Sequence, residues 1–329
     1  MSSAASQSSL SNQFFQLGFV QRLESWLQAM PHPSTVVEIA APHVAVARWV
    51  GKSGHLEGVA SEALPTGAVM ASPVETNVVQ PDAVRSALRK VLGRVEPGGT
   101  PVALLIPDPV VRVFILPFDT LPRRASDALP LLRWRLKKSV PFDMDDTVVS
   151  WMRQVGREGG LEVLTAVARQ PIIREYEALL ESLGARAGVI LSSTLAALPL
   201  LEDRGATLFV RLTGKTLTTV IVHGAVLCVY RSTEVRADAA TLDAKAMLDE
   251  VFPAVAYYQD SWRSTIDRAR LSGFGPRQDV FSQALAEEIN IPAGSIDNAE
   301  PMRTLESQVK DLVPQGLDAL AGWMMNGKS

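Results

Sequence analysis

Alternating hydrophobic and polar positions recur in many short runs of the chain, and such runs predict β-strands. Three of these runs follow one another near the beginning of the chain, and three more in its second half, with only turn residues between them. The strands of these two meanders are predicted at 35–40, 44–49, 56–60, 207–210, 217–222 and 225–231. The repeated meander indicates two related units within one chain.

Segments with helical spacing of apolar residues follow each meander and alternate with further strand-like runs. Helices are predicted at 81–95, 125–139, 171–183, 193–201, 241–264, 279–288 and 316–325. Additional strands are predicted at 101–106, 110–116, 161–169, 187–191 and 268–272. A meander followed by helix and strand units, present twice, favours an α/β, two-lobed actin/Hsp70-like (ribonuclease H-like) fold.

The domain organisation follows from this repeat. Residues 1–33 are predicted to be a disordered start and an amphipathic helix, 34–200 the first lobe and 201–329 the second lobe. A subdomain at about 81–155 is predicted to be inserted in the first lobe. The amphipathic helix, 13–30, has an apolar face and a single basic residue, Arg22. Docking on its own domain is therefore favoured over partner binding, and membrane contact is the least favoured role.

Composition narrows the function classes. The 329 residues carry a net charge of −3, which does not favour nucleic-acid binding. The single cysteine, Cys228, lies in an apolar strand and is expected to be a buried thiol in a reducing compartment. The four histidines do not have metal-site spacing, and no apolar run reaches the length of a membrane span. These features predict a cytoplasmic protein without a metal site.

Two short motifs raise the question of nucleotide binding. Gly214-Lys215-Thr216 and Gly51-Lys52-Ser53 both match the end of a P-loop, but each lacks the earlier glycine that the motif requires. The first motif also stands between two predicted strands, whereas a P-loop joins a strand to a helix. It is therefore interpreted as a hairpin turn.

Four stretches resemble the PilM family of type IV pilus assembly proteins, which are relatives of the cell-division protein FtsA. The stretches are 102–117 (VALLIPDPVVRVFILP), 132–142 (LRWRLKKSVPF), 164–176 (LTAVARQPIIREY) and 270–275 (RLSGFG). Each is weak alone, but their order and spacing extend the resemblance over roughly 34–325. The neighbouring possibility is the cytosolic domain of the type II secretion protein GspL.

The resemblance implies a cytosolic protein, peripheral at the inner membrane, that belongs to the pilus platform. PilM-type proteins bind the cytosolic N-terminal tail of a bitopic PilN-like partner in a groove of the first lobe, and many bind ATP. We expect the tail to add along an edge strand of that lobe. Candidate groove residues are Val102, Leu104, Ile106, Val111, Val113, Trp134 and Phe142. Self-association is a further possibility, and membrane contact is expected only through the partner.

The resemblance also locates the nucleotide cleft, where this chain departs from the family pattern. The first phosphate turn reads Glu38, Ala40, Ala41 and Pro42, so a proline removes an amide donor and a methyl group replaces a glycine hydrogen. The second turn has Arg211 where relatives have a metal-orienting aspartate, followed by Thr213, Gly214 and Lys215. The adenosine loop keeps Gly273 and Gly275.

An arginine cannot hold Mg²⁺, so ATP hydrolysis is not expected and no cofactor is predicted; ATP with Mg²⁺ is the alternative. Arg211 either touches a phosphate or pairs with a carboxylate of the opposite lobe such as Glu38, and the pairing is favoured. We therefore expect a non-enzymatic scaffold with a degenerate nucleotide site. An ATP-dependent switch of the same fold is the second reading, and a sugar-kinase-like enzyme, which needs an aspartate base between the lobes, is the third.

Two charged segments remain. Arg133, Arg135, Lys137 and Lys138 form a basic patch, for which a solvated face is the default and attraction to anionic lipid or an acidic partner is the alternative. The acids Asp143, Asp145 and Asp146 are expected to form a solvated loop rather than a metal site.

Overall fold

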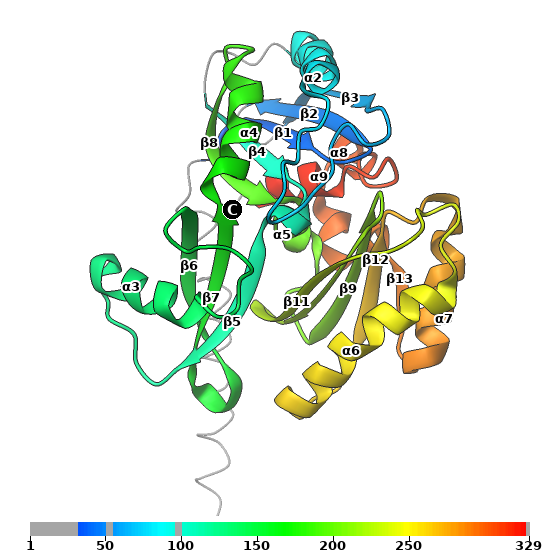
Figure 1. The fold of residues 1–329 in the computed structure, drawn as a ribbon. Helices are drawn as coiled ribbons and strands as arrows, with labels where there is room; N and C mark the ends of the chain where they lie inside the picture. The colour runs from blue at the N-terminus through cyan, green and yellow to red at the C-terminus, as the bar shows by residue number, and fades with distance from the viewer. Residues whose placement is uncertain (1–31, 51–54, 96–100, 327–329) are drawn as a thin grey trace, which may run out of the picture.

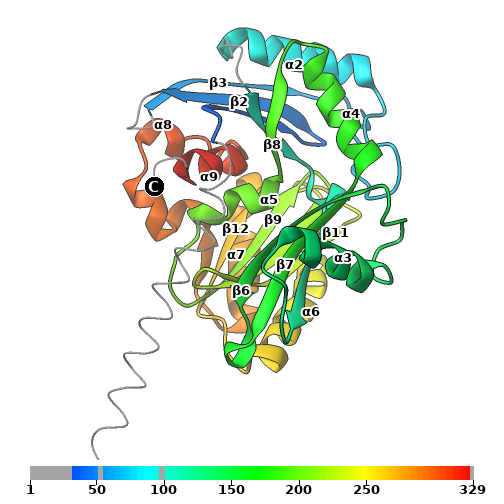
Figure 2. The same cartoon turned by 90° about the vertical axis from the view of Figure 1, so that its left-hand side faces the viewer.

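The computed structural model describes residues 32–50, 55–95 and 101–326. The predicted amphipathic helix 13–30 and the turn 51–54 lie outside these residues. Three β-sheets with helices packed on them make up the described part of the chain (Figures 1 and 2). Each of the two larger sheets consists of a meander extended by parallel strands, so the predicted α/β class and the duplicated element order are confirmed.

The first sheet has the strand order β3-β2-β1-β4-β8. Its strands are β1 (Thr35–Ile39), β2 (His43–Val50), β3 (His55–Ala63), β4 (Pro101–Ile106) and β8 (Arg186–Ser192). Helices α2 (Pro81–Val95) and α4 (Gln170–Glu181) cover one face, and their apolar stripes pack against that face in one core cluster. The central strands β1 and β4 are buried on both faces, which explains their continuous apolar sequences.

The second sheet repeats this arrangement with the order β11-β10-β9-β12-β13. Its strands are β9 (Ala206–Thr213), β10 (Thr216–His223), β11 (Val226–Glu234), β12 (Arg268–Ser272) and β13 (Ala293–Ser295). Helices α6 (Ala244–Trp262) and α7 (Gln278–Ile289) pack on it through a separate core cluster. The two sheets with their helices are the two lobes.

Short helices lie between the two sheets and join the lobes into one core (Figure 2). They are α5 (Ser193–Ala197), α8 (Ser307–Lys310) and α9 (Asp318–Asn326). Helices α5 and α9 approach so closely that a Cβ on Gly322 would lie 2.2 Å from the Ala196 carbonyl oxygen. The buried Trp323 belongs to the same cluster, so the C-terminal helix is part of the interface between the lobes.

A third sheet, with the order β5-β7-β6, projects from the first lobe. Its strands are β5 (Arg112–Phe118), β6 (Thr147–Val155) and β7 (Leu161–Arg169), and helix α3 (Ala125–Leu136) packs on one face. No strand is predicted at the position of β6. The sequence predicts this insertion at about 81–155, whereas β4 belongs to the first sheet, α2 packs on that sheet, and β7 belongs to the insertion.

Candidate functional site

The two hairpin turns that hold phosphate in nucleotide-binding relatives face each other across the lobe interface. In the second lobe, Thr213 pairs with Thr216 across a tight turn, so Gly214-Lys215-Thr216 is the predicted hairpin and not a P-loop. Gly214 has a φ of +60°, and a Cβ on it would lie 3.6 Å from the Pro42 ring and 3.7 Å from the Ala41 Cβ. The two turns therefore lie close together, with room for a methyl group and little more beside Gly214.

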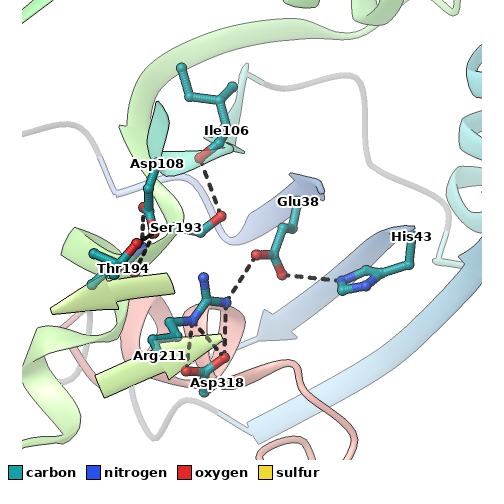
Figure 3. A network of polar contacts seen from close by, with 9 residues as sticks. Glu38, His43, Ile106, Asp108, Ser193, Thr194, Arg211 and Asp318 are labelled. Carbon is teal, nitrogen blue, oxygen red and sulfur yellow. Dashed lines mark hydrogen bonds and ion pairs between the residues drawn. The ribbon is translucent and has the colours of Figure 1, made fainter. Parts of the chain in front are cut away.

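A buried ion triad lies directly behind these turns (Figure 3). The Arg211 guanidinium, on β9, donates two parallel hydrogen bonds to Asp318, from Nε to Oδ2 and from Nη2 to Oδ1, each of 2.9 Å. Its Nη2 also lies 3.3 Å from Glu38 Oε1, at the end of β1. Because all three side chains are at most 2% exposed, this is a desolvated bridge between the lobes.

The charges of the triad stabilise one another. Burial alone would raise the pKa of Glu38, but the neighbouring His43 and Arg211 outweigh it and hold this pKa at about 2. His43 Nε2 lies 3.5 Å from Glu38 Oε2. Burial opposes the charge of Arg211, and the attraction of Asp318 and Glu38 nevertheless raises its pKa. Asp318 stands in the first turn of α9, where the helix dipole also favours a carboxylate.

The pairing of Arg211 with Glu38 was predicted, whereas Asp318 was missed. Asp318 lies 107 residues from Arg211, in a helix that carries no nucleotide motif, so no local pattern could reveal it. Asp318 is the main partner of Arg211, because it accepts two hydrogen bonds of 2.9 Å whereas Glu38 Oε1 lies 3.3 Å from the guanidinium. The triad leaves the guanidinium facing protein carboxylates, not a phosphate.

A further buried carboxylate, Asp108, also lies between the two lobes. It follows β4 and accepts hydrogen bonds from the Thr194 backbone N–H at 2.9 Å, the Thr194 hydroxyl at 2.5 Å and the Thr218 hydroxyl at 2.7 Å. Thr218 is on β10, so Asp108 also bridges the lobes. It has the position of an interlobe base, as a sugar-kinase-like enzyme requires, but both of its oxygens accept bonds from this chain.

The local backbone structure explains both glycines of the predicted adenosine loop. A Cβ on Gly273 would lie 1.9 Å from the Leu212 carbonyl oxygen, and its φ is +86°. Gly275 has a φ of +54° with open space around it. Between them, the buried Phe274 packs on Phe281 with ring centroids 4.5 Å apart. This loop is thus fixed by its contacts with β9 and α7.

A separate groove of about 310 Å³ opens in the first lobe, between the third sheet and the first. One wall consists of side chains of β6 and β7, and the other of side chains of α4 and the end of β8. Its lining residues are Ile106, Val111, Val148, Ser150, Ala166, Ala168, Gln170, Ile173, Arg174, Glu177 and Ile190. The floor is therefore small and apolar, while charged groups stand at the rim on α4.

The candidate groove residues are only partly brought together. Ile106 and Val111 line the groove. Val102 and Leu104 are fully buried, and β4 pairs with β1 and β8 on its two sides, so the expectation of an edge strand there is wrong. Val113 and Phe142 pack into core clusters. Trp134 is 74% exposed on α3, which covers the opposite face of the third sheet.

Other chemistry is limited in the described part of the chain. Cys228 is buried, and burial raises the pKa of its thiol, as expected for a structural cysteine. No group of three or more His, Cys, Asp or Glu residues within 32–50, 55–95 and 101–326 could hold a metal ion. None of the helices described is long and apolar enough to cross a membrane.

Comparison with known proteins gives structural likenesses but no match by sequence. No family model and no curated protein matches the sequence. A chain of the PilM–PilN type IV pilus biogenesis complex superposes with a TM-score of 0.67 at 17% identity, covering 91% of this chain and all of that one. This chain has the PilM-type, actin-like fold.

Other matched structures have lower TM-scores. The cytoplasmic domain of EpsL, an inner-membrane component of the Vibrio cholerae type II secretion system, has a TM-score of 0.46 at 13% identity, covering 72% of this chain and 80% of that one. A Bacteroides thetaiotaomicron protein with an actin-like ATPase fold has a TM-score of 0.45 at 9% identity, covering 82% and 95%. The assignment of the PilM-type fold rests on the first structure.

Proposed function

We propose that this chain is a cytosolic scaffold of a type IV pilus or related secretion platform, and that it binds the cytosolic N-terminal tail of a bitopic PilN-like membrane protein. The proposal rests on one observation above all. The chain shares its fold, over the whole length of the matched structure, with a component of the PilM–PilN complex, and its first lobe carries an open apolar groove.

The groove has the properties that an extended peptide requires. Ala166, Ala168 and Ser150 leave space beside the sheet, whereas Ile173 and Ile190 offer apolar contacts on the other side. Strand β6 pairs only with β7 and β8 pairs only with β4, so each is an edge strand of its sheet. A peptide between them could add backbone hydrogen bonds and insert alternate side chains into the groove.

We also propose that the scaffold works without hydrolysing ATP. The resemblance aligns Arg211 with a metal-orienting carboxylate, but Arg211 is paired with Asp318, and little space is left beside Gly214 between the two turns. Opening the cleft for a nucleotide would separate Arg211 from Glu38 across the lobes.

The test is to measure binding of a synthetic peptide that carries the tail of the PilN-like protein encoded in the same genome. Fluorescence anisotropy with labelled peptide gives the dissociation constant for the wild type and for Ser150→Trp. Ser150 is exposed, so a tryptophan there fills the groove without disturbing the core. We expect wild-type binding and at least a roughly 100-fold loss in the variant, the effect of losing about 3 kcal/mol of contacts.

The matched control is Ser307→Trp. Ser307 is an exposed serine on α8, and it does not line the groove. It should bind the peptide like the wild type. Equal binding by Ser150→Trp and the wild type would exclude this groove as the peptide site. Absence of binding by the wild type would overturn the proposed partner.

A further inference from the structure

The outer face of helix α3 combines exposed apolar residues with cations. Leu131, Trp134 and Arg135 follow the spacing i, i+3 and i+4 and therefore share one side of the helix, and the exposed Lys137 and Lys138 follow its last residue. Trp134 is 74% exposed and Leu131 43%. The opposite side of the helix buries Ala128, Leu132 and Leu136 in the third sheet, so folding does not explain the exposed tryptophan.

We propose that this face of α3 binds the surface of an anionic membrane. The inference rests on the proposed function for its setting, because a scaffold that holds the tail of a membrane-anchored protein works beside the bilayer. Tryptophan favours the membrane–water interface, and lysine and arginine are attracted to anionic headgroups.

The charges around the face fit a surface contact. Arg135 belongs to this face, the exposed Lys137 and Lys138 follow the helix, and Arg123 and Arg124 precede it. Arg133 is not available, since its guanidinium donates to the Thr147 carbonyl at 2.9 Å. Four acids oppose the attraction: Asp127 on α3 and the exposed Asp143, Asp145 and Asp146 in the loop that follows. Neutralising that loop should therefore strengthen binding.

The position of α3 permits contact with a flat surface. The helix lies at the outer side of the molecule, beyond the third sheet as seen from the second lobe (Figure 1). It covers the face of β7 that carries Val163 and Val167, whereas the groove is lined by Ala166 and Ala168 on the other face. The membrane and the partner tail would therefore occupy opposite faces of one small sheet. Trp134 does not line the groove of the first lobe, so its exposure is separate from the proposed peptide site.

The test is co-sedimentation of the full chain with vesicles of phosphatidylcholine alone or mixed with phosphatidylglycerol. No partner peptide is present, so this result is independent of the groove experiment. We expect recruitment only to the anionic vesicles, and weaker recruitment at high salt. Arg135→Glu/Lys137→Glu/Lys138→Glu should lower the partition coefficient by roughly 100-fold, and Trp134→Ala by roughly tenfold. Asp143→Asn/Asp145→Asn/Asp146→Asn should raise it.

Matched controls lie on the second lobe. Arg204→Glu/Lys245→Glu reverses exposed cations there, and Phe252→Ala removes an aromatic side chain that is 54% exposed on α6. Both should leave recruitment unchanged. Absence of wild-type recruitment, or wild-type recruitment that survives in the Trp134 and triple variants, would overturn the proposal. Binding of a labelled oligoglutamate peptide in place of vesicles would instead assign the face to an acidic protein.

Discussion

The cleft between the lobes and the groove in the first lobe differ in what fills them. In the cleft, the chain supplies the cation and the two carboxylates of an ion triad, and it brings two turns close together. In the groove, small side chains on β6 and β7 leave about 310 Å³ of space beside an apolar wall. The difference is that the cleft is filled by contacts within the chain, whereas the groove stays open.

The strongest test of the filled cleft is to remove the central charge of the triad, that of Arg211. Arg211→Met leaves Glu38 and Asp318 buried without their cation, and loss of one partner of a buried pair costs about 3–5 kcal/mol. We expect the free energy of unfolding, measured in urea, to fall by that amount. The matched control is Glu38→Gln/Arg211→Met/Asp318→Asn, which removes all three charges and should recover most of the loss. A single variant as stable as the wild type would show that the triad does not hold the lobes together.

The pH dependence of stability tests the contribution of the Glu38 carboxylate to the triad. The pKa of Glu38 is lowered from 4.5 to about 2, so its contribution is complete above pH 4.5 and is lost as the pH falls towards 2. The depression corresponds to about 3 kcal/mol. The stability difference between the wild type and Glu38→Gln should therefore be largest near neutral pH and shrink between pH 4.5 and 2. A difference that does not change over this range would contradict the role given to the carboxylate.

The adenosine loop offers a smaller, paired test. Gly273→Ala places a methyl group against the Leu212 carbonyl and forces a left-handed alanine, whereas Gly275→Ala meets open space and carries only the conformational strain. That strain costs about 1–2 kcal/mol. Thermal unfolding should show Gly273→Ala destabilised by about 2 kcal/mol more than Gly275→Ala. Equal losses would mean that the contact with β9 is not what requires a glycine at 273.

Much of the fold followed from the sequence, because local patterns determine it. The boundaries of α2, β4, β7 and β12 were predicted as they stand, since each is a continuous periodic segment between turn residues. The lobe-bridging pair of Arg211 and Glu38 also followed, because the resemblance placed both at the phosphate turns. These features depend on neighbours in the sequence or on aligned motifs.

What was missed depends on contacts between distant segments. Asp318 reaches Arg211 only because α9 packs between the sheets. The sequence of β4 is that of an ordinary apolar strand, and only its parallel pairing with β8 shows that both of its edges are hydrogen-bonded to neighbouring strands. The groove is formed by β6, β7, α4 and β8 together, so its lining had no continuous signature.

The smallest expected effect is the response to nucleotide. A ligand that binds only the folded state raises stability by about 2.7 kcal/mol at 100 times its dissociation constant. Because Arg211 is already paired with Asp318 and little space is left beside Gly214, millimolar Mg²⁺-ATP should leave the melting temperature of the wild type unchanged compared with Mg²⁺ alone. Calorimetric titration should likewise show no heat of binding. A magnesium-dependent rise in melting temperature would mean that the lobes open despite their ion pairs, and the scaffold would then be a nucleotide-controlled switch whose groove responds to the cleft.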